Sequence, residues 1–110
     1  RLESELLTEE VAFYNKVDNI RIKGTLTLPE SDRPLSAVIL VPGSGRTNRN
    51  GTEDDILKPF LEIADFLSNN EMAVLRCDKR GVGDSEGTLD FNTTIEDLTT
   101  DIIASIDFLN

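Results

Sequence analysis

The chain has 110 residues, which allows one small domain, and 38% of them are hydrophobic, as in a globular protein. Its formal net charge of -10 argues against binding to nucleic acid or to an anionic membrane surface, because both need a basic patch. No apolar run approaches the roughly 18 residues of a membrane span, and no signal-peptide pattern is present. We expect a soluble protein and slightly favour the cytoplasm, although the start at Arg1 leaves export with a removed leader open.

Histidine is absent, and Cys77 is the single cysteine. The missing histidine removes Ser-His and Cys-His nucleophile pairs as well as the commonest metal ligand. One cysteine cannot form an internal disulfide, and Cys77 ends an apolar run, which is typical of a small buried hydrophobe. We therefore predict no cofactor site and no metal site in this chain.

The first third of the chain has the pattern of an antiparallel hairpin. Residues 1–10 are acidic and mostly polar, and we expect a frayed or short helical lead-in there. Strands are predicted near 11–17 and 20–28, where apolar and polar residues alternate, with a turn at Asp18-Asn19. The alternation predicts one buried face and one wet face, as antiparallel strands allow.

A strand–helix–strand unit is predicted next. Residues 36–42 are apolar on both faces, like a parallel strand covered by helices, and they run into a glycine-rich turn, Gly43-Ser44-Gly45. After a long polar loop, residues 56–69 carry a helical apolar stripe, and a short apolar strand is predicted near 71–76. We expect the two strands to lie parallel with a right-handed crossover.

The last predicted element is an amphipathic helix near 94–109. Thr93, followed three residues later by Glu96, predicts a capping box at its start. Its apolar residues share one helical face, which we expect to pack on the sheet. They are Ile95, Leu98, Ile102, Ile106 and Leu109.

The two glycine-rich loops are the candidate sites of chemistry. The loop at 43–45 could bind phosphate, form a plain tight turn, or present a backbone N–H to a developing oxyanion. Nucleotide binding is disfavoured because neither G-x-x-x-x-G-K-[ST] nor G-x-G-x-x-G occurs. The second loop contains G-x-S-x-G around Ser85, but the flanking strand and helix lie near Cys77 and Thr93, eight residues away on either side. A nucleophile elbow needs both elements adjacent, so Ser85 is predicted to be a turn residue.

Charged residues in these loops are weaker candidates. The acids at 53–55 and 84–90 lack EF-hand spacing and indicate a solvated acidic surface more than a cation site. Arg46 and Arg49 could contact an anionic substrate group, although we favour their being ordinary exposed residues.

The order of these elements is similar to the N-terminal half of the α/β-hydrolase family, and more narrowly to bacterial esterases or dienelactone-hydrolase-like members. The resemblance rests on residues 24–29, 38–45, 49–50 and 72–85 and extends over nearly the whole chain from residue 11. It implies that 1–110 is the N-terminal portion of a single α/β domain. The expected fold is an incomplete three-layer sandwich with a partial sheet of strand order 1-2-4-3-5, in which the fifth strand is missing.

The resemblance also implies roles for particular residues. The third-strand loop of the family usually reads His-Gly, and here Pro42 replaces the histidine; the donor in that loop is a backbone amide. By position, the Ser44 amide would be the oxyanion donor, and Gly43 would belong to the same loop. The nucleophile, the acid and the histidine come later in the family, so no triad residue is expected in this chain. A small-molecule carboxylic ester is the expected substrate of the complete protein, whereas the 110-residue chain alone should be inactive.

The implied sheet order leaves strand 36–42 at an open edge, which is a template for further pairing. We expect the remainder of a hydrolase domain, or a second copy of this chain, to pair with that edge. The alternative function is a non-catalytic binding or interaction domain built on half of this fold, which would explain the absence of histidine directly.

Overall fold

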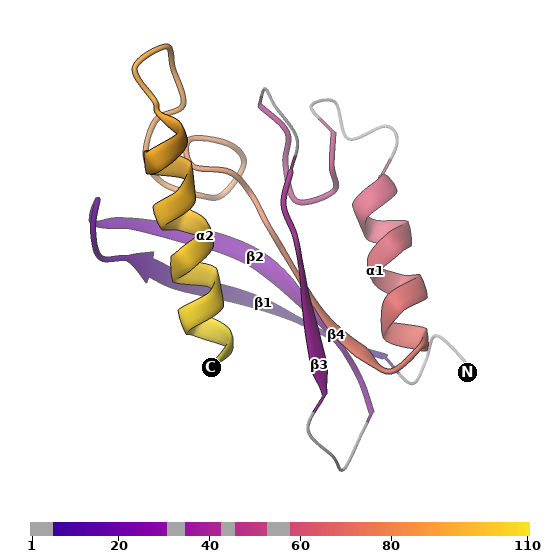
Figure 1. Ribbon diagram of the computed structural model, residues 1–110. Coiled ribbons are helices and arrows are strands. Elements are labelled where there is room, and N and C mark those ends of the chain that lie inside the picture. The colour runs from indigo at the N-terminus through magenta and orange to yellow at the C-terminus, as the bar shows by residue number, and fades with distance from the viewer. Residues whose placement is uncertain (1–5, 31–34, 43–45, 53–57) are drawn as a thin grey trace.

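The computed structural model describes residues 6–30, 35–42, 46–52 and 58–110 (Figure 1). Four strands and two helices form in these residues. They are β1 (Leu6–Asn15), β2 (Ile20–Pro29), β3 (Ser36–Leu40), α1 (Pro59–Asn69), β4 (Met72–Cys77) and α2 (Ile95–Leu109).

The four strands form one mixed sheet in the order β1-β2-β4-β3. β1 and β2 make the predicted antiparallel hairpin, β2 pairs antiparallel with β4, and β3 pairs parallel with β4. This confirms the α/β class and the predicted order of the first four strands. Within the described residues, β3 has a strand neighbour on one side only.

The two helices cover opposite faces of the sheet (Figure 1). α1 lies over β2 and β4, where the Ser68 hydroxyl donates a hydrogen bond to the Thr27 carbonyl at 3.3 Å. α2 lies over β1 and β3 on the other face. Successive β4 side chains point to alternate faces of the sheet, so this short apolar strand contributes side chains to the interface with each helix. The arrangement is the expected three-layer sandwich, open on the β3 side.

The main core lies under α2. Phe13, Ile22 and Leu75 are buried there against Ala104 and other partly buried apolar side chains. The rings of Phe13 and Phe108 also stack, with centroids 5.1 Å apart. Aromatic stacking of this kind adds to the area it buries, so it fastens the last turn of α2 to the hairpin.

The lead-in predicted for residues 1–10 is wrong over the described part, because 6–10 belong to β1. Their partners are residues 25–29 of β2, so the hairpin extends to its full ten-residue length. The mostly polar 6–10 segment tolerates this because it lies at the sheet edge with most of its residues exposed. At the other end β1 stops at Asn15, and Val17, predicted as a strand residue, lies in the turn with 76% of its surface exposed.

The predicted start of the last helix also needs a correction. The capping box of α2 is made by Thr94 and Asp97, one residue later than predicted: the Thr94 hydroxyl accepts from the Asp97 amide, and the Asp97 carboxylate accepts from the Thr94 amide. Thr93 instead accepts a hydrogen bond from the Asp90 amide in the preceding turn. α1 begins at Pro59, which occupies the first turn as predicted, while residues 53–57 lie outside the described part.

The apolar stripe of α2 packs on the sheet only in part. Leu109 contacts the core, and Leu98 and Ile102 line a cavity beside it, but Ile95 and Ile106 are 80% and 46% exposed. The expectation that the whole stripe packs on the sheet is therefore wrong. The residue of α2 that is most deeply buried is Ser105, and α2 keeps apolar surface that no described residue covers.

Gly24 lies in β2 where the backbone of β4 packs closely against it. A Cβ at this position would lie 2.3 Å from the Arg76 carbonyl oxygen and 2.7 Å from Cys77 Sγ. We predict that Gly24→Ala lowers the free energy of unfolding by about 1–3 kcal/mol, because strand backbone cannot yield as a flexible side chain can. Urea unfolding followed by circular dichroism measures this change. Lys23→Ala, one residue away in β2, is the control and should change the stability much less; equal effects of the two substitutions would contradict the prediction.

Candidate functional site

The carboxyl ends of β3 and β4 define the candidate site. These strands run parallel, from the pair Ser36–Met72 to the pair Leu40–Arg76, so their carboxyl ends meet at one edge of the sheet. Ligands of open α/β sheets bind outside such ends. The chain leaves β3 toward residues 41–52 and leaves β4 toward residues 78–94. These two connections surround the site.

The predicted oxyanion residues Gly43 and Ser44 lie outside the described residues, so their roles stay predictions. The described chain before them stops at Val41 and Pro42, just after β3. It continues at Arg46.

Asp78, the first residue after β4, joins the two loops. Its carboxylate is 4% exposed and accepts three hydrogen bonds. The Arg49 amide donates to Oδ1 at 2.8 Å, and the Arg49 guanidinium donates to Oδ2 at 2.9 Å. The Asp84 amide also donates to Oδ2, at 3.0 Å. One buried carboxylate thus holds both the loop after β3 and the turn after β4.

Arg49 is not the exposed residue that we expected. Its side chain is 12% exposed and reaches across the sheet to Thr25 Oγ1, at 2.8 Å, and to the Glu10 carboxylate. Arg46, in contrast, is exposed as predicted and donates to the carbonyls of Gly81 and Leu89. The sequence gives no signal for the difference, because it depends on how the loop folds back over β1 and β2.

Electrostatics keep this pair ionised. Burial by itself raises the pKa of Asp78, but hydrogen bonds from Arg49 and from the Asp84 amide outweigh it and hold the pKa below the usual value. Burial likewise lowers the pKa of Arg49, and the bonds to Asp78 and Glu10 outweigh it and raise the pKa. The pair is a charged, hydrogen-bonded contact at any pH near neutrality.

Ser85 lies in the glycine-rich loop, as the distances to its flanking elements predict. Its hydroxyl donates to the Asp78 carbonyl at 2.8 Å and accepts from the Lys23 amide at 3.0 Å. Both bonds attach the loop to neighbouring backbone. The residue is 8% exposed, which does not suit a nucleophile that must meet a substrate.

Arg80 makes a second buried ionic cluster, which the sequence analysis missed. Its guanidinium donates to Asp101 on α2 and to Asp18 in the hairpin turn, each at 2.8 Å. Asn15 reaches the same Asp101 carboxylate at 2.7 Å. Bonds to Asp101 and Asp18 raise the pKa of Arg80 despite burial, so the cluster is a fixed structural tie between the hairpin and α2.

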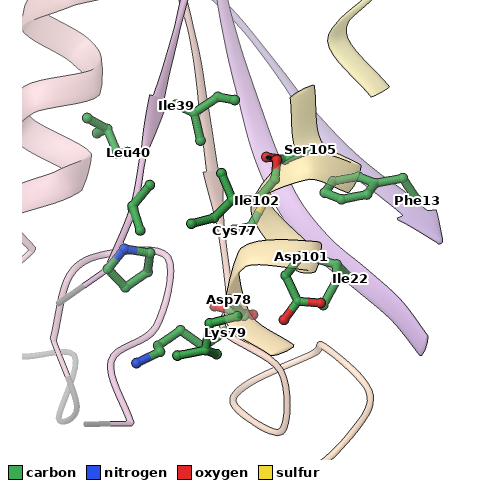
Figure 2. A pocket seen from close by; sticks show the side chains of 13 residues that line it. Phe13, Ile22, Ile39, Leu40, Cys77, Asp78, Lys79, Asp101, Ile102 and Ser105 are labelled. Carbon is green, nitrogen blue, oxygen red and sulfur yellow. Dashed lines mark hydrogen bonds between the residues drawn. The ribbon is translucent and has the colours of Figure 1, made fainter. Parts of the chain in front are cut away.

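A cavity of about 270 Å³ lies between the sheet and α2 beside β3 (Figure 2). Ile39 and Leu40 of β3, Cys77 of β4 and Ile102 of α2 are among the side chains around it. The lining surface is mostly apolar, although Asp78, Lys79, Asp101 and Ser105 also border the cavity. The cavity suits apolar side chains better than a polar ligand.

Two further observations concern metal binding and membrane crossing by the described residues. Among them, no three His, Cys, Asp or Glu side chains gather in a way that could hold a metal ion. None of their helices has the length and apolarity needed to cross a bilayer.

We predict that Cys77 is unreactive in the native protein. Burial raises the pKa of its thiol to about 12. At pH 8 the thiolate fraction is then on the order of 1,000-fold smaller than for a free cysteine with a pKa near 8.5. Alkylation by iodoacetamide should be correspondingly slow and should become fast in 8 M urea, where the thiol is exposed. Rapid alkylation of the native protein would contradict this.

Comparison with known proteins supports a fold assignment. No protein-family model matches the sequence, and no curated protein matches it significantly. Solved structures do match: a hypothetical protein from Pseudomonas aeruginosa (TM-score 0.73, 21% identity, 99% of this chain and 32% of the other) and an esterase from Pyrococcus furiosus (0.71, 22%, 94% and 34%). Est1E from Butyrivibrio proteoclasticus, solved with ferulic acid bound, matches with TM-score 0.65 and 20% identity over 90% of this chain and 36% of the other.

These structures have in common an architecture of which the present chain spans about a third of the length. Identities near 20% establish the fold and nothing finer. The strand order, the parallel β3–β4 pair and the helices on opposite faces agree with that architecture. The chain has the fold of the N-terminal part of an α/β hydrolase.

Proposed function

We propose that this chain forms the N-terminal part of a serine hydrolase of the α/β type that acts on carboxylic esters. One observation carries the proposal: β3 pairs parallel with β4, so its carboxyl end lies at the edge of the sheet where α/β proteins bind ligands. In the sequence, Gly43-Ser44-Gly45 follows that end of β3. The Pyrococcus furiosus esterase among the matching structures supports the same assignment.

In this proposal the chain contributes an oxyanion donor. A serine nucleophile from the rest of the domain attacks the ester carbonyl, and the Ser44 amide donates to the oxygen as its negative charge develops. The general base also comes from the rest of the domain, since the chain has no histidine. Asp78, Arg49 and Ser85 join the described parts of the two loops that follow β3 and β4.

The remainder of the domain also has a place to pack. In the described part of the chain β3 pairs only with β4, which leaves its other edge for another strand. The adjacent cavity is lined in part by residues of β3 and α2. The same helix also carries exposed apolar residues, among them Ile95 and Ile106. We propose that the following part of a hydrolase domain pairs with β3 and fills this cavity. A second copy of this chain is the other candidate for the same edge.

A non-catalytic binding or interaction domain is the second candidate function. The absence of histidine favours it, because the chain cannot supply a Ser-His pair. The two candidates differ in what they require outside these residues: the enzyme needs a nucleophile, an acid and a histidine, and the binding domain needs none of them.

The full-length protein that contains this chain should hydrolyse p-nitrophenyl esters and react with a fluorophosphonate probe, which labels activated serines. The labelled serine, identified by mass spectrometry, should lie outside residues 1–110. Ser44→Ala is the control: because the donor is an amide, it should retain most activity, whereas loss of such a donor typically costs 100- to 1,000-fold. Absence of hydrolysis and labelling would overturn the enzyme assignment and leave the binding domain. Labelling at Ser85 or inactivity of Ser44→Ala would overturn the roles assigned here.

The open edge of β3 should make the 110-residue chain associate when it is produced alone. We predict a sedimentation-equilibrium mass that rises with concentration, because β3 has no strand neighbour on its outer edge in the described residues and such an edge is a template for pairing. Ala37→Lys places a charge on β3 and should shift the equilibrium toward monomer. Ala12→Lys is matched to it, since Ala12 is also an exposed alanine in an edge strand, and it should have little effect. A concentration-independent monomer would contradict the prediction.

A further inference from the structure

We propose that Asp78 is a positioning residue, whose carboxylate sets the backbone of loop 46–52 against the turn that follows β4. The consequence for catalysis rests on the proposed function, in which the oxyanion donor, Ser44, lies two residues before this loop in the sequence. The fastening itself rests on geometry alone.

Three N–H groups from two loops converge on the Asp78 carboxylate. Arg49 supplies two of them, its peptide amide to Oδ1 at 2.8 Å and its guanidinium to Oδ2 at 2.9 Å. Because a backbone group and a side-chain group of the same residue are both held, the position and the orientation of the peptide before Arg49 are fixed together. The third donor is the Asp84 amide, at 3.0 Å from Oδ2.

The turn packs directly on this carboxylate. Gly83 has φ +55°, and a Cβ there would lie 2.5 Å from Asp78 Oδ2. Glycine is thus required both for the left-handed backbone and for the close approach. The carboxylate, 4% exposed, is enclosed by the groups that it binds.

Other contacts anchor the same loop to different elements. The Asn50 carbonyl accepts from the Phe60 amide of α1 at 3.0 Å, and Asn50 Oδ1 accepts from the Arg76 guanidinium of β4 at 2.6 Å. The Arg49 guanidinium extends to Thr25 of β2. Asp78 differs from these anchors because its buried carboxylate joins the loop backbone to the backbone of the turn after β4.

The chemistry requires a carboxylate at this position. An ionised carboxylate offers only acceptors, so both oxygens can face N–H donors. An asparagine side chain of the same size would turn one NH₂ group toward donors and lose the charge that pairs with Arg49. Asp78→Asn therefore preserves volume and removes the fastening selectively.

An effect on catalysis follows from the nature of the proposed donor. A backbone amide has no side-chain torsions with which to recover its direction, so its placement depends on the backbone to either side. A displacement of about 1 Å at a reacting centre can cost on the order of 100-fold in rate. We expect Asp78→Asn to lower kcat by about that factor while KM changes little.

The test compares Asp78→Asn with Asp84→Asn in the full-length protein. Asp84 is a matched control: its carboxylate also contacts the Arg49 guanidinium, at 3.1 Å, but its side chain is 69% exposed. Amide hydrogen exchange should be at least tenfold faster at Arg49 in Asp78→Asn and nearly unchanged in Asp84→Asn. Exchange at Leu75 in the sheet core should be the same in all three proteins. Unchanged exchange at Arg49, or equal acceleration at Leu75, would overturn the positioning role.

Kinetics and spectroscopy complete the test. With p-nitrophenyl esters, Asp78→Asn should lose kcat at constant KM and Asp84→Asn should stay within about threefold of the parent; equal kcat values would overturn the catalytic consequence. If the parent protein hydrolyses no ester, the proposed function fails, while the exchange experiment still decides whether Asp78 fastens the loop. If Asp78→Asn does not fold, NMR scalar coupling across the hydrogen bond from the Arg49 amide to the Asp78 carboxylate in the parent protein decides instead, and its absence would overturn the proposal.

Discussion

The parallel pairing of β3 with β4 is the constraint on which the rest of this structure depends. It brings two carboxyl ends to one edge of the sheet, so that both loops leave the strands side by side. Loops that meet in this way carry many backbone polar groups in a confined space, and those groups need partners. The Asp78 carboxylate and the Ser85 hydroxyl supply several of them. The turn after β4 is therefore as much a part of the site as the loop after β3.

Arg49 and Arg80, whose side chains are largely covered, connect different layers of the structure. Arg49 joins the loop after β3 to β1, β2 and the turn after β4, and Arg80 joins the hairpin turn to α2. Each guanidinium serves several acceptors at once, because its donors are spread over a plane, whereas the donors of a lysine share one nitrogen. In a chain with 21 acidic and 11 basic residues, these cations also offset the repulsion among buried or half-buried carboxylates. The acidic surface and the ordered loops are thus compatible.

Much of the fold could be predicted from the sequence, because hydrophobic pattern and turn chemistry are local. The two-sided apolar run of β3 and the alternation in β2 identified a parallel and an antiparallel strand. The local pattern could not decide between two adjacent capping residues. Thr93 and Thr94 each stand three residues before an acid, and only the backbone conformation shows that Thr94 is the N-cap. Pairing with β2 extends β1 over the mostly polar residues 6–10. The contacts of Arg49 could not be predicted, because its partners lie 24 or more positions away in sequence and no local pattern links them.

The stack of Phe13 on Phe108 has a consequence for how the protein is made. It joins the first strand to the last turn of the last helix, and Asn15 and Asp101 repeat the connection nearby. A ribosome releases the hairpin at about 5–20 residues per second, so several seconds pass before α2 can emerge to cover it. During that interval Phe13 and Ile22 face water on a two-stranded ribbon, which is marginally stable by itself. The nascent hairpin is therefore the stage at which this chain has most need of a chaperone that binds apolar surface.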